Sequence, residues 1–244
     1  MSRIAVYTSI FGPYDGLLPQ KKFPNVDYIC FTDQPFKSKT WEIRHIDPVY
    51  DDPTRNSRRI KIQPHKFLPE YDVSIFMDGN YLIVKDINEL IEKELNGRKM
   101  LVFDHNQAED KRDCVYDEFE AIVALGKKSG KHKDDPEVMR KQIERYRKEG
   151  YPAKNGLVFS AVLVRRHHDP EVVKTMTTWW EELSNNSKRD QLSFDYAAWK
   201  NNFKFHVLDG DLRNHKYFKM IGKHRQNYKT KYLRYRLKKF FGLS

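Results

Sequence analysis

The sequence predicts a single α/β domain in which a mainly parallel central sheet is flanked by helices. Segments rich in β-branched and aromatic residues alternate with segments of helical periodicity, and no segment is repeated along the chain. The chain has 244 residues, 39% of them hydrophobic, which is enough for one large domain with a buried core. Asp33 and Asp78 each follow an expected strand, and open parallel sheets bind ligands at the carboxyl ends of their strands.

The expected strands contain β-branched and aromatic residues and end at turn-forming residues such as Phe11-Gly12-Pro13. In chain order they span residues 3–10, 26–32, 41–46, 73–77, 81–84, 99–103, 157–164 and 203–208. The expected helices have apolar residues at helical spacing, and Asp169 is a suitable cap for one of them. They span residues 54–65, 87–95, 113–125, 136–149, 170–183 and 189–200. This order favours one α/β domain over residues 1–212, followed by a distinct segment over 213–244.

The last part of the chain accounts for the net charge of +11. Residues 213–244 contain eleven Lys or Arg and no Asp or Glu, whereas the preceding part contains 34 residues of each sign. The body of the protein is therefore electrically balanced, which disfavours a basic nucleic-acid-binding domain.

Composition also limits the compartment. No apolar stretch approaches the roughly 20 residues of a membrane span, and the N-terminal segment MSRIAVYTSIF fits a first strand better than a signal peptide. The two cysteines, Cys30 and Cys114, do not form a disulfide framework. A cytoplasmic, reduced protein is the simplest interpretation.

An Asp-Gly-Asn sequence interrupts the apolar run SIFMDGNYLIV. Asp and Asn favour turns and Asp-Gly is a hairpin signal, so a simple turn is one interpretation. The other is a cation site, because Mg²⁺ and Mn²⁺ prefer oxygen ligands and substrate phosphates complete their coordination. Asp78 and Asn80 supply two such oxygens, and Gly79 lets the backbone approach a ligand.

This motif resembles the Asp-x-Asp motif of GT-A-fold glycosyltransferases, which hold a nucleotide-sugar diphosphate through a divalent metal. Asn80 stands where that family has its second Asp, and it offers a neutral oxygen. The resemblance covers roughly residues 4–224 and is closest to a group of glycosyltransferase-like domains found in bacteria and plants. The segments that carry it are VYTSIFGPYDGL, YICFTD, RRIKIQPHKFLPEYDVSIFMDGN and RDQLSFDYAAWK.

The resemblance implies a nucleotide-sugar site along the carboxyl ends of the first strands. The loop after the first strand, from Thr8 to Tyr14, would contact the base and ribose, and Asp33 would approach the nucleoside. Arg58 and Lys61 lie three residues apart on an expected helix, so they share a face. Paired cations suit a diphosphate, although a solvated helix face is the alternative interpretation.

The same resemblance implies a bound Mn²⁺ or Mg²⁺ ion. Asp78 and Asn80 are its implied ligands, and Gly79 would lie against the nucleotide sugar together with Asp78. A histidine late in the chain is often the third ligand in related enzymes. His215 is the first candidate here and His224 is the alternate.

The segment RDQLSFDYAAWK would face the reacting sugar. Asp190 is implied as the general base that activates an acceptor hydroxyl in an inverting reaction. Gln191 would instead support the oxocarbenium-like charge in a retaining reaction. Asp195, one turn later, is a fallback base, and capping of the helix that begins at Asp190 is an alternative role for that residue.

Residues 216–241 interleave cations with aromatic side chains, a pattern typical of a basic amphipathic helix at an anionic membrane surface. A packed terminal helix with a solvated face is an alternative interpretation. A nucleic-acid contact ranks below both, so no nucleic-acid partner is expected.

The sequence therefore predicts a metal-dependent glycosyltransferase of the hexosyl- or deoxyhexosyltransferase class. It would move a sugar from a nucleotide-sugar donor to a glycan or lipid-linked acceptor in cell-surface polysaccharide synthesis, peripherally at the inner face of a membrane. One alternative is a nucleotidyltransferase acting on sugar phosphates, which also places carboxylates and a metal beside a nucleotide. The other is a non-enzymatic basic module that binds RNA or a membrane.

Overall fold

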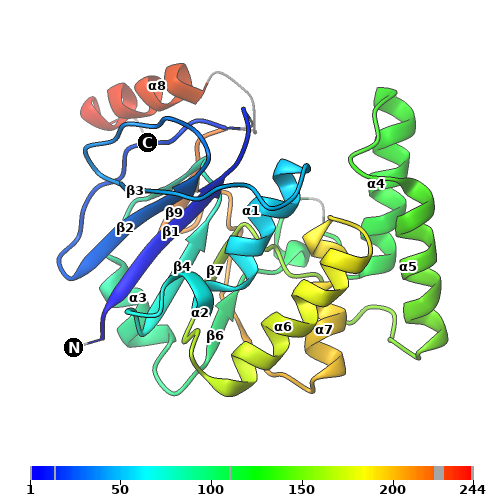
Figure 1. Ribbon diagram of the computed structural model, residues 1–244. Helices are drawn as coiled ribbons and strands as arrows, with labels where there is room; N and C mark the ends of the chain where they lie inside the picture. Colours follow the sequence, from blue (N-terminus) through cyan, green and yellow to red (C-terminus); the bar gives the residue numbers. More distant parts are fainter. Residues whose placement is uncertain (1, 14, 110, 223–227, 243–244) are drawn as a thin grey trace.

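A seven-stranded sheet forms the centre of the molecule, in the spatial order β3-β2-β1-β4-β7-β6-β8 (Figure 1). The computed structural model describes residues 2–13, 15–109, 111–222 and 228–242. The strands are β1 (Ile4–Ile10), β2 (Val26–Thr32), β3 (Glu42–His45), β4 (Val73–Met77), β6 (Met100–Val102), β7 (Val162–Arg165) and β8 (His206–Val207). Only β7 of these strands runs antiparallel to its neighbours, β4 and β6, so the predicted α/β class with a mainly parallel sheet is confirmed.

Helices cover both faces of this sheet (Figure 1). They are α1 (Pro53–Ile62), α2 (Pro64–Phe67), α3 (Ile87–Glu94), α4 (Val115–Ser129), α5 (Pro136–Lys148), α6 (Pro170–Asn185), α7 (Phe194–Lys200) and α8 (Tyr228–Phe240), with 3-10 turns η1 (His105–Gln107) and η2 (Asp190–Leu192). Four helices begin with an aspartate whose side chain accepts a backbone N–H of the first turn, which explains their starting points. These caps are Asp52, Asp86, Asp135 and Asp169. None of the helices in the described ranges combines the length and apolar character needed to cross a membrane.

The two faces of the sheet bury separate clusters because side chains alternate along each strand. On β1, Val6 and Ile10 point to the face that α3 covers, while Tyr7 points to the face that α1, α6 and α7 cover. A third cluster joins α4 and α5 to α7, around the stacked rings of Tyr146 and Tyr196. The α4–α5 pair thus stands beside the sheet rather than over it (Figure 1).

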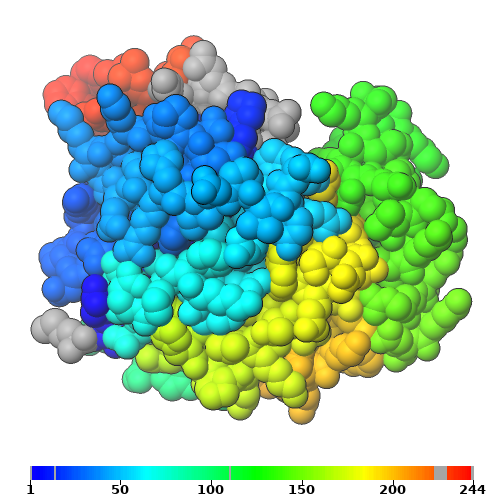
Figure 2. All heavy atoms as spheres, in the orientation of Figure 1, coloured from blue at the N-terminus to red at the C-terminus, as the bar shows by residue number. Residues whose placement is uncertain are grey.

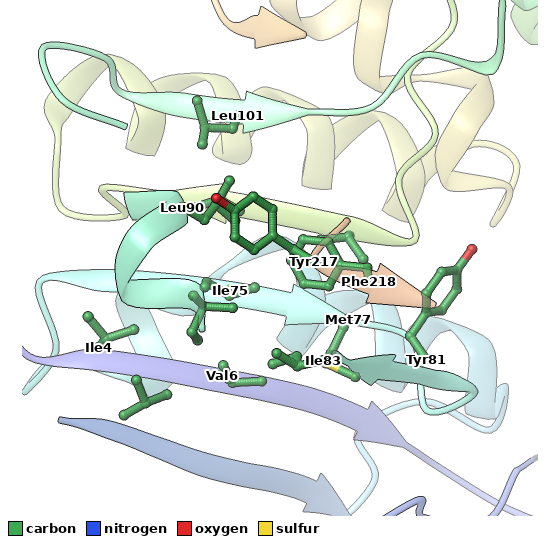
Figure 3. Packing of buried hydrophobic residues seen from close by; sticks show 14 of the residues in the cluster. Ile4, Val6, Ile75, Met77, Tyr81, Ile83, Leu90, Leu101, Tyr217 and Phe218 are labelled. Carbon is green, nitrogen blue, oxygen red and sulfur yellow. The ribbon is translucent and has the colours of Figure 1, made fainter. Parts of the chain in front are cut away.

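A second, two-stranded sheet crosses the α3 face. It pairs β5 (Tyr81–Ile83) with β9 (Phe218–Met220) in antiparallel register. Tyr217 and Phe218 are buried there, and Figure 3 shows them over Ile75 and Met77 of β4. Strand β9 was not expected from the sequence, so part of the basic segment after residue 212 belongs to the core.

Three predicted elements differ from the structure. The helix expected at 54–65 divides at Gln63 into α1 and α2, because Pro64 lacks a backbone N–H. Of the strand expected at 157–164, only the part from Val162 belongs to β7, while Val158 forms an isolated antiparallel bridge with Asp104 beyond the end of β6. The helix expected at 189–200 starts with the tight turn η2 before α7 begins.

Candidate functional site

The Asp-Gly-Asn turn follows β4 at the carboxyl edge of the sheet. The Asp78 N–H donates to the Ala161 carbonyl at 2.9 Å, and the Tyr81 N–H closes the turn on the Asp78 carbonyl at 3.1 Å. A Cβ atom on Gly79 would lie 3.1 Å from Ile10 Cδ1 and 3.4 Å from the Gly16 carbonyl oxygen. Glycine therefore lets the turn lie close against the end of β1, while the Asp78 side chain stays partly exposed.

Asn80 is held from the other side by the chain beyond β9. Its Nδ2 donates to the Gly222 carbonyl at 2.5 Å, and its own carbonyl accepts the Ile221 N–H at 2.9 Å. The side chain is 2% exposed, yet its Oδ1 has no hydrogen-bond partner among the described residues. A buried acceptor left without a partner is costly, so this oxygen is the kind of atom that a bound cation would satisfy.

The turn therefore offers two oxygen ligands to a hard divalent ion. No group of three His, Cys, Asp or Glu side chains that would hold a metal occurs within the described ranges. A site built here would rely on a substrate to complete its coordination, as Mg²⁺ and Mn²⁺ sites commonly do.

His215, the predicted third ligand, is engaged elsewhere. It is 9% exposed, its Nδ1 accepts the Tyr217 N–H at 3.4 Å, and the ring also bonds to the Asp209 backbone. Its ring packs edge-on against Phe103 with centroids 4.9 Å apart, and burial lowers the pKa of His215 to about 4. Burial and these backbone contacts argue against a role for His215 as a metal ligand. His224, the alternate, lies outside the described residues.

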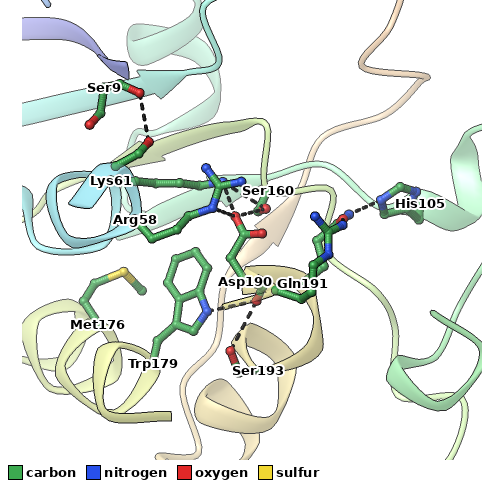
Figure 4. A network of polar contacts seen from close by, with 12 residues as sticks. Ser9, Arg58, Lys61, His105, Ser160, Met176, Trp179, Asp190, Gln191 and Ser193 are labelled. Carbon is green, nitrogen blue, oxygen red and sulfur yellow. Dashed lines mark hydrogen bonds and ion pairs between the residues drawn. The ribbon is translucent and has the colours of Figure 1, made fainter. Parts of the chain in front are cut away.

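Asp190 lies at the centre of a buried polar cluster (Figure 4). Its Oδ2 accepts from the Lys61 Nζ at 2.5 Å and the Ser160 Oγ at 3.0 Å, and the Arg58 Nε lies 3.0 Å away. The Trp179 indole donates to the Asp190 backbone carbonyl at 3.0 Å. The structure therefore brings Arg58 and Lys61 together as the helical spacing predicts, but around a carboxylate of the protein itself.

The electrostatics of this cluster oppose the base role predicted for Asp190. Burial works to raise the pKa of Asp190, but the nearby Arg58, Lys61 and Arg189 hold it well below its usual range. Burial lowers the pKa of Lys61, and the negative charges of Asp190 and Asp78 oppose that shift. A carboxylate stabilised in this way is a poor proton acceptor.

Lys61 does not reach a bound diphosphate in this arrangement. Its side chain is 1% exposed, and its ammonium group is bonded to Asp190 and Ser160. Arg58 is more accessible, with 18% of its side chain exposed. The negative charge of Asp78 lies close enough to Lys61 to act on its pKa. The turn and the cluster are therefore next to each other at one edge of the sheet.

Gln191 points away from Asp190 toward a histidine that sequence reasoning missed (Figure 4). Its amide contacts the His105 Nε2, and the His105 ring stacks on Phe159 with centroids 4.2 Å apart. His105 follows the end of β6 much as Asp78 follows β4. Position after a strand was therefore a signal that could have identified it.

Asp195, the fallback base, is buried. Its Oδ2 accepts the Val158 N–H at 3.0 Å, which anchors the loop before β7. Burial raises the pKa of Asp195 to about 7, and the charge of Asp104 acts in the same direction. Its 2% exposure keeps this carboxyl from direct contact with an acceptor hydroxyl.

The residues predicted to bind the nucleoside are distributed differently. Thr8 lies within β1, because pairing with β2 continues to Ile10, and its side chain is 1% exposed. This burial corrects the expectation that Thr8 contacts the base or ribose. Asp33 accepts the Gly12 N–H at 2.9 Å and so fixes the loop after β1. Tyr14 lies outside the described residues.

A cleft of about 460 Å³ opens beside this loop. Its lining comes from the end of β1, the start of α1 and the segment before η2: Phe11, Pro13, Asp51, Asp52, Pro53, Thr54 and Lys188. Lys188 bonds to Asp52 at 2.5 Å across it. The cleft thus lies at the same carboxyl edge as the turn, and Lys188 is part of its lining.

A search of curated proteins found no match. The bifunctional glycosyltransferase WbbM in its apo form is similar at a TM-score of 0.49 and 11% identity, over 85% of this chain and 39% of that one. The apo form of mouse xyloside xylosyltransferase 1 is similar at a TM-score of 0.46 and 12% identity, over 85% of each chain. This chain spans about two fifths of the WbbM chain.

A family model also matches most of the chain. The model of the TOD1/MUCI70 glycosyltransferase-like domain matches residues 32–222, a range that includes the Asp-Gly-Asn turn, the Asp190 cluster and β9. The chain belongs to the TOD1/MUCI70 glycosyltransferase-like domain family.

Proposed function

We propose that this protein is a metal-dependent glycosyltransferase that takes its sugar from a nucleotide-sugar donor. The observation that carries the proposal is the buried Oδ1 of Asn80, which has no hydrogen-bond partner among the described residues, two residues after the partly exposed Asp78. Family membership supports the glycosyltransferase class. The oxygen-only character of the turn supports Mn²⁺ or Mg²⁺ rather than a softer metal.

Asp78 and Asn80 would hold the ion, which when bound neutralises charge on the departing nucleoside diphosphate. Asp33 keeps the loop after β1 in place, and the adjoining cleft is of a size suited to a nucleoside. Arg58, partly exposed and fixed by Asp190, presents its guanidinium group to the same edge.

Asp190 acts in this proposal as a positioning residue. Its charge compensates Lys61 and orients Arg58, so it shapes the donor side of the site without exchanging a proton. Gln191 and His105 contact each other beside the Asp190 cluster. We assign this polar pair to the side of the site that binds the acceptor.

The acceptor would be a glycan or a lipid-linked sugar in cell-surface polysaccharide synthesis, and the transferred sugar a hexose or deoxyhexose. A cytoplasmic, reducing compartment suits the two buried free thiols, Cys30 and Cys114. Burial raises the pKa of Cys30 to about 12, so this thiol is chemically inert.

Thermal-shift measurements with a panel of nucleotide sugars and nucleoside diphosphates, with Mn²⁺ or with EDTA, test the proposal. A ligand present at 100 times its Kd stabilises the folded state by about 2.7 kcal/mol. We expect one donor class to raise the melting temperature in Mn²⁺ and to lose this effect in EDTA. Equal shifts in both conditions, or none for any donor, would contradict the metal site.

Product analysis then distinguishes the competing reaction. A released nucleoside diphosphate supports sugar transfer. Released pyrophosphate supports a nucleotidyltransferase and would overturn the proposal.

A further inference from the structure

Helix α8 has two different apolar faces. Tyr232 and Tyr235 pack inward against the cluster of Leu18 and Leu82, and the Lys219 ammonium lies 5.4 Å from the centroid of the Tyr235 ring. These contacts dock the helix on the α3 side of the molecule, next to the strand pair β5–β9.

The outward face carries an unpartnered apolar stripe, which we define as Leu233, Leu237, Phe240 and Phe241. Their exposed fractions are 57%, 50%, 83% and 67%. Leu233 and Leu237 lie four residues apart, and Phe240 follows three residues later, so the helical repeat places them on one side. Four of the eight large hydrophobic side chains exposed in the described chain belong to this stripe.

Cations border the stripe on both sides. At 100° per residue, Arg236 falls on one flank, and Arg234 and Lys238 fall on the other. All three side chains are exposed, and the sequence from 213 to 244 contains no acidic residue that would offset them.

We propose that α8 binds the surface of an anionic lipid bilayer through the apolar stripe. Leucine and phenylalanine side chains enter the boundary between headgroups and acyl chains, while the flanking cations contact lipid phosphates. A nucleic acid fits this face less well, because leucine offers no ring on which a base stacks. The positive charge around an apolar centre is complementary to an anionic membrane surface.

The position of α8 gives this docking a direction. It lies on the surface of the molecule (Figure 2), near the carboxyl ends of β1 and β2 (Figure 1). Ile221, which packs in the same cluster as Tyr232, donates its N–H to Asn80. Membrane contact would therefore hold the site close to the lipid surface, which suits a lipid-linked acceptor. This last step rests on the proposed function, whereas the binding itself does not.

Flotation of the full chain with lipid vesicles tests the inference. Vesicles of phosphatidylcholine alone are compared with vesicles that also contain phosphatidylglycerol, at low and at high salt. The wild type should float with the anionic vesicles only, and high salt should weaken its binding. Leu233→Gln/Leu237→Gln should weaken it at least about tenfold. Arg234→Gln/Lys238→Gln should weaken it about 30-fold.

Matched controls come from α4, where Leu125 is 48% exposed and Lys127 and Lys128 are exposed. Leu125→Gln and Lys127→Gln/Lys128→Gln should float like the wild type, and all variants should keep the wild-type melting temperature. Unchanged flotation of the leucine variant would overturn the inference. So would absence of wild-type flotation, or displacement from vesicles by a single-stranded RNA. Asp78→Ala should float normally, so failure of the donor site and failure of membrane binding remain distinguishable.

Discussion

The Asp78–Asn80 turn and the Asp190 cluster lie side by side at one edge of the sheet, but their buried oxygens differ in what they bind. Asp190 Oδ2 has three partners within 3.0 Å, from Lys61, Ser160 and Arg58. Asn80 Oδ1, equally buried, has no partner in the described part of the chain. A saturated carboxylate supports the scaffold, whereas an unsatisfied oxygen indicates a place for a ligand.

The difference matters because both segments looked alike in the sequence, as acidic motifs at the ends of secondary-structure elements. Burial does not separate them, since both are 2% exposed. The neighbouring charges do distinguish them, because Arg58 and Lys61 contact Asp190. Mutations at the cluster should therefore affect folding, and mutations at the turn should affect ligand binding.

The largest effect is expected from Asp190→Ala. Removing one partner of a buried ion pair leaves Lys61 uncompensated, which typically costs about 3–5 kcal/mol. Urea denaturation should show this loss in the free energy of unfolding. Glu89→Ala, which breaks the two surface ion pairs of Glu89 with Lys85 and Lys93, is the control and should leave the midpoint nearly unchanged. A stable Asp190→Ala protein would place Asp190 outside the scaffold and reopen its role as a base.

Asp78→Ala should leave folding intact and reduce function. We expect a loss of about 10²–10³-fold in kcat/KM, the range for removing one electrostatic stabiliser of a transition state. The melting temperature without ligand should stay close to that of the wild type. Glu92→Ala, exposed on α3, is the matched carboxylate control for the kinetic assay. Wild-type turnover in the Asp78 variant would refute the turn as the metal site.

Asn80→Asp adds a negative charge at the buried oxygen that has no partner among the described residues, and so tests the contrast with Asp190 directly. A carboxylate should strengthen Mn²⁺ binding about tenfold, because ligand charge raises affinity for hard cations. Asn80→Ala should weaken it by a similar factor. Mn²⁺ titration in the presence of a nucleoside diphosphate, followed by calorimetry or electron paramagnetic resonance, measures both. Equal affinities in all three proteins would show that residue 80 does not coordinate the ion.

The smallest effect concerns Asp195, whose pKa is raised from 3.8 to about 7. Between these pH values the Asp195 carboxyl keeps its proton in the folded chain and loses it in the unfolded chain. The contribution of Asp195 to the free energy of unfolding therefore falls as the pH rises. Asp195→Asn keeps an acceptor for the Val158 N–H and removes the titration. Its melting temperature should exceed that of the wild type at pH 8, and the difference should disappear as the pH falls to 4. Parallel wild-type and variant profiles would show that Asp195 titrates normally.

Local sequence patterns predicted the fold better than they predicted the site. The strands β1 and β4 are continuous runs of buried side chains, β2 departs from such a run only at Asp27, and composition alone marks runs of this kind. The Asp-Gly-Asn turn was visible for the same reason, because it interrupts one of them. Strand β9 was missed, since three residues carry little periodicity and its partner β5 lies far away in sequence.

The roles of individual site residues depended on long-range contacts that local patterns do not encode. Lys61 and Asp190 are 129 positions apart, and their ion pair makes the residue predicted as the base a poor proton acceptor. His215 was chosen for its place late in the chain, whereas the Asp209 and Tyr217 backbone groups decide its role.

The contact between Asn80 and Gly222 joins positions 142 residues apart, and it bears on how the protein is made. A ribosome delivers the chain in order, so every strand of the central sheet emerges before the support of the Asp-Gly-Asn turn exists. A nascent chain that ends near residue 212 would contain every strand of the central sheet but not the hydrogen bond between Asn80 and Gly222. The support of the Asp-Gly-Asn turn should therefore form only late in translation, after the body of the domain has folded.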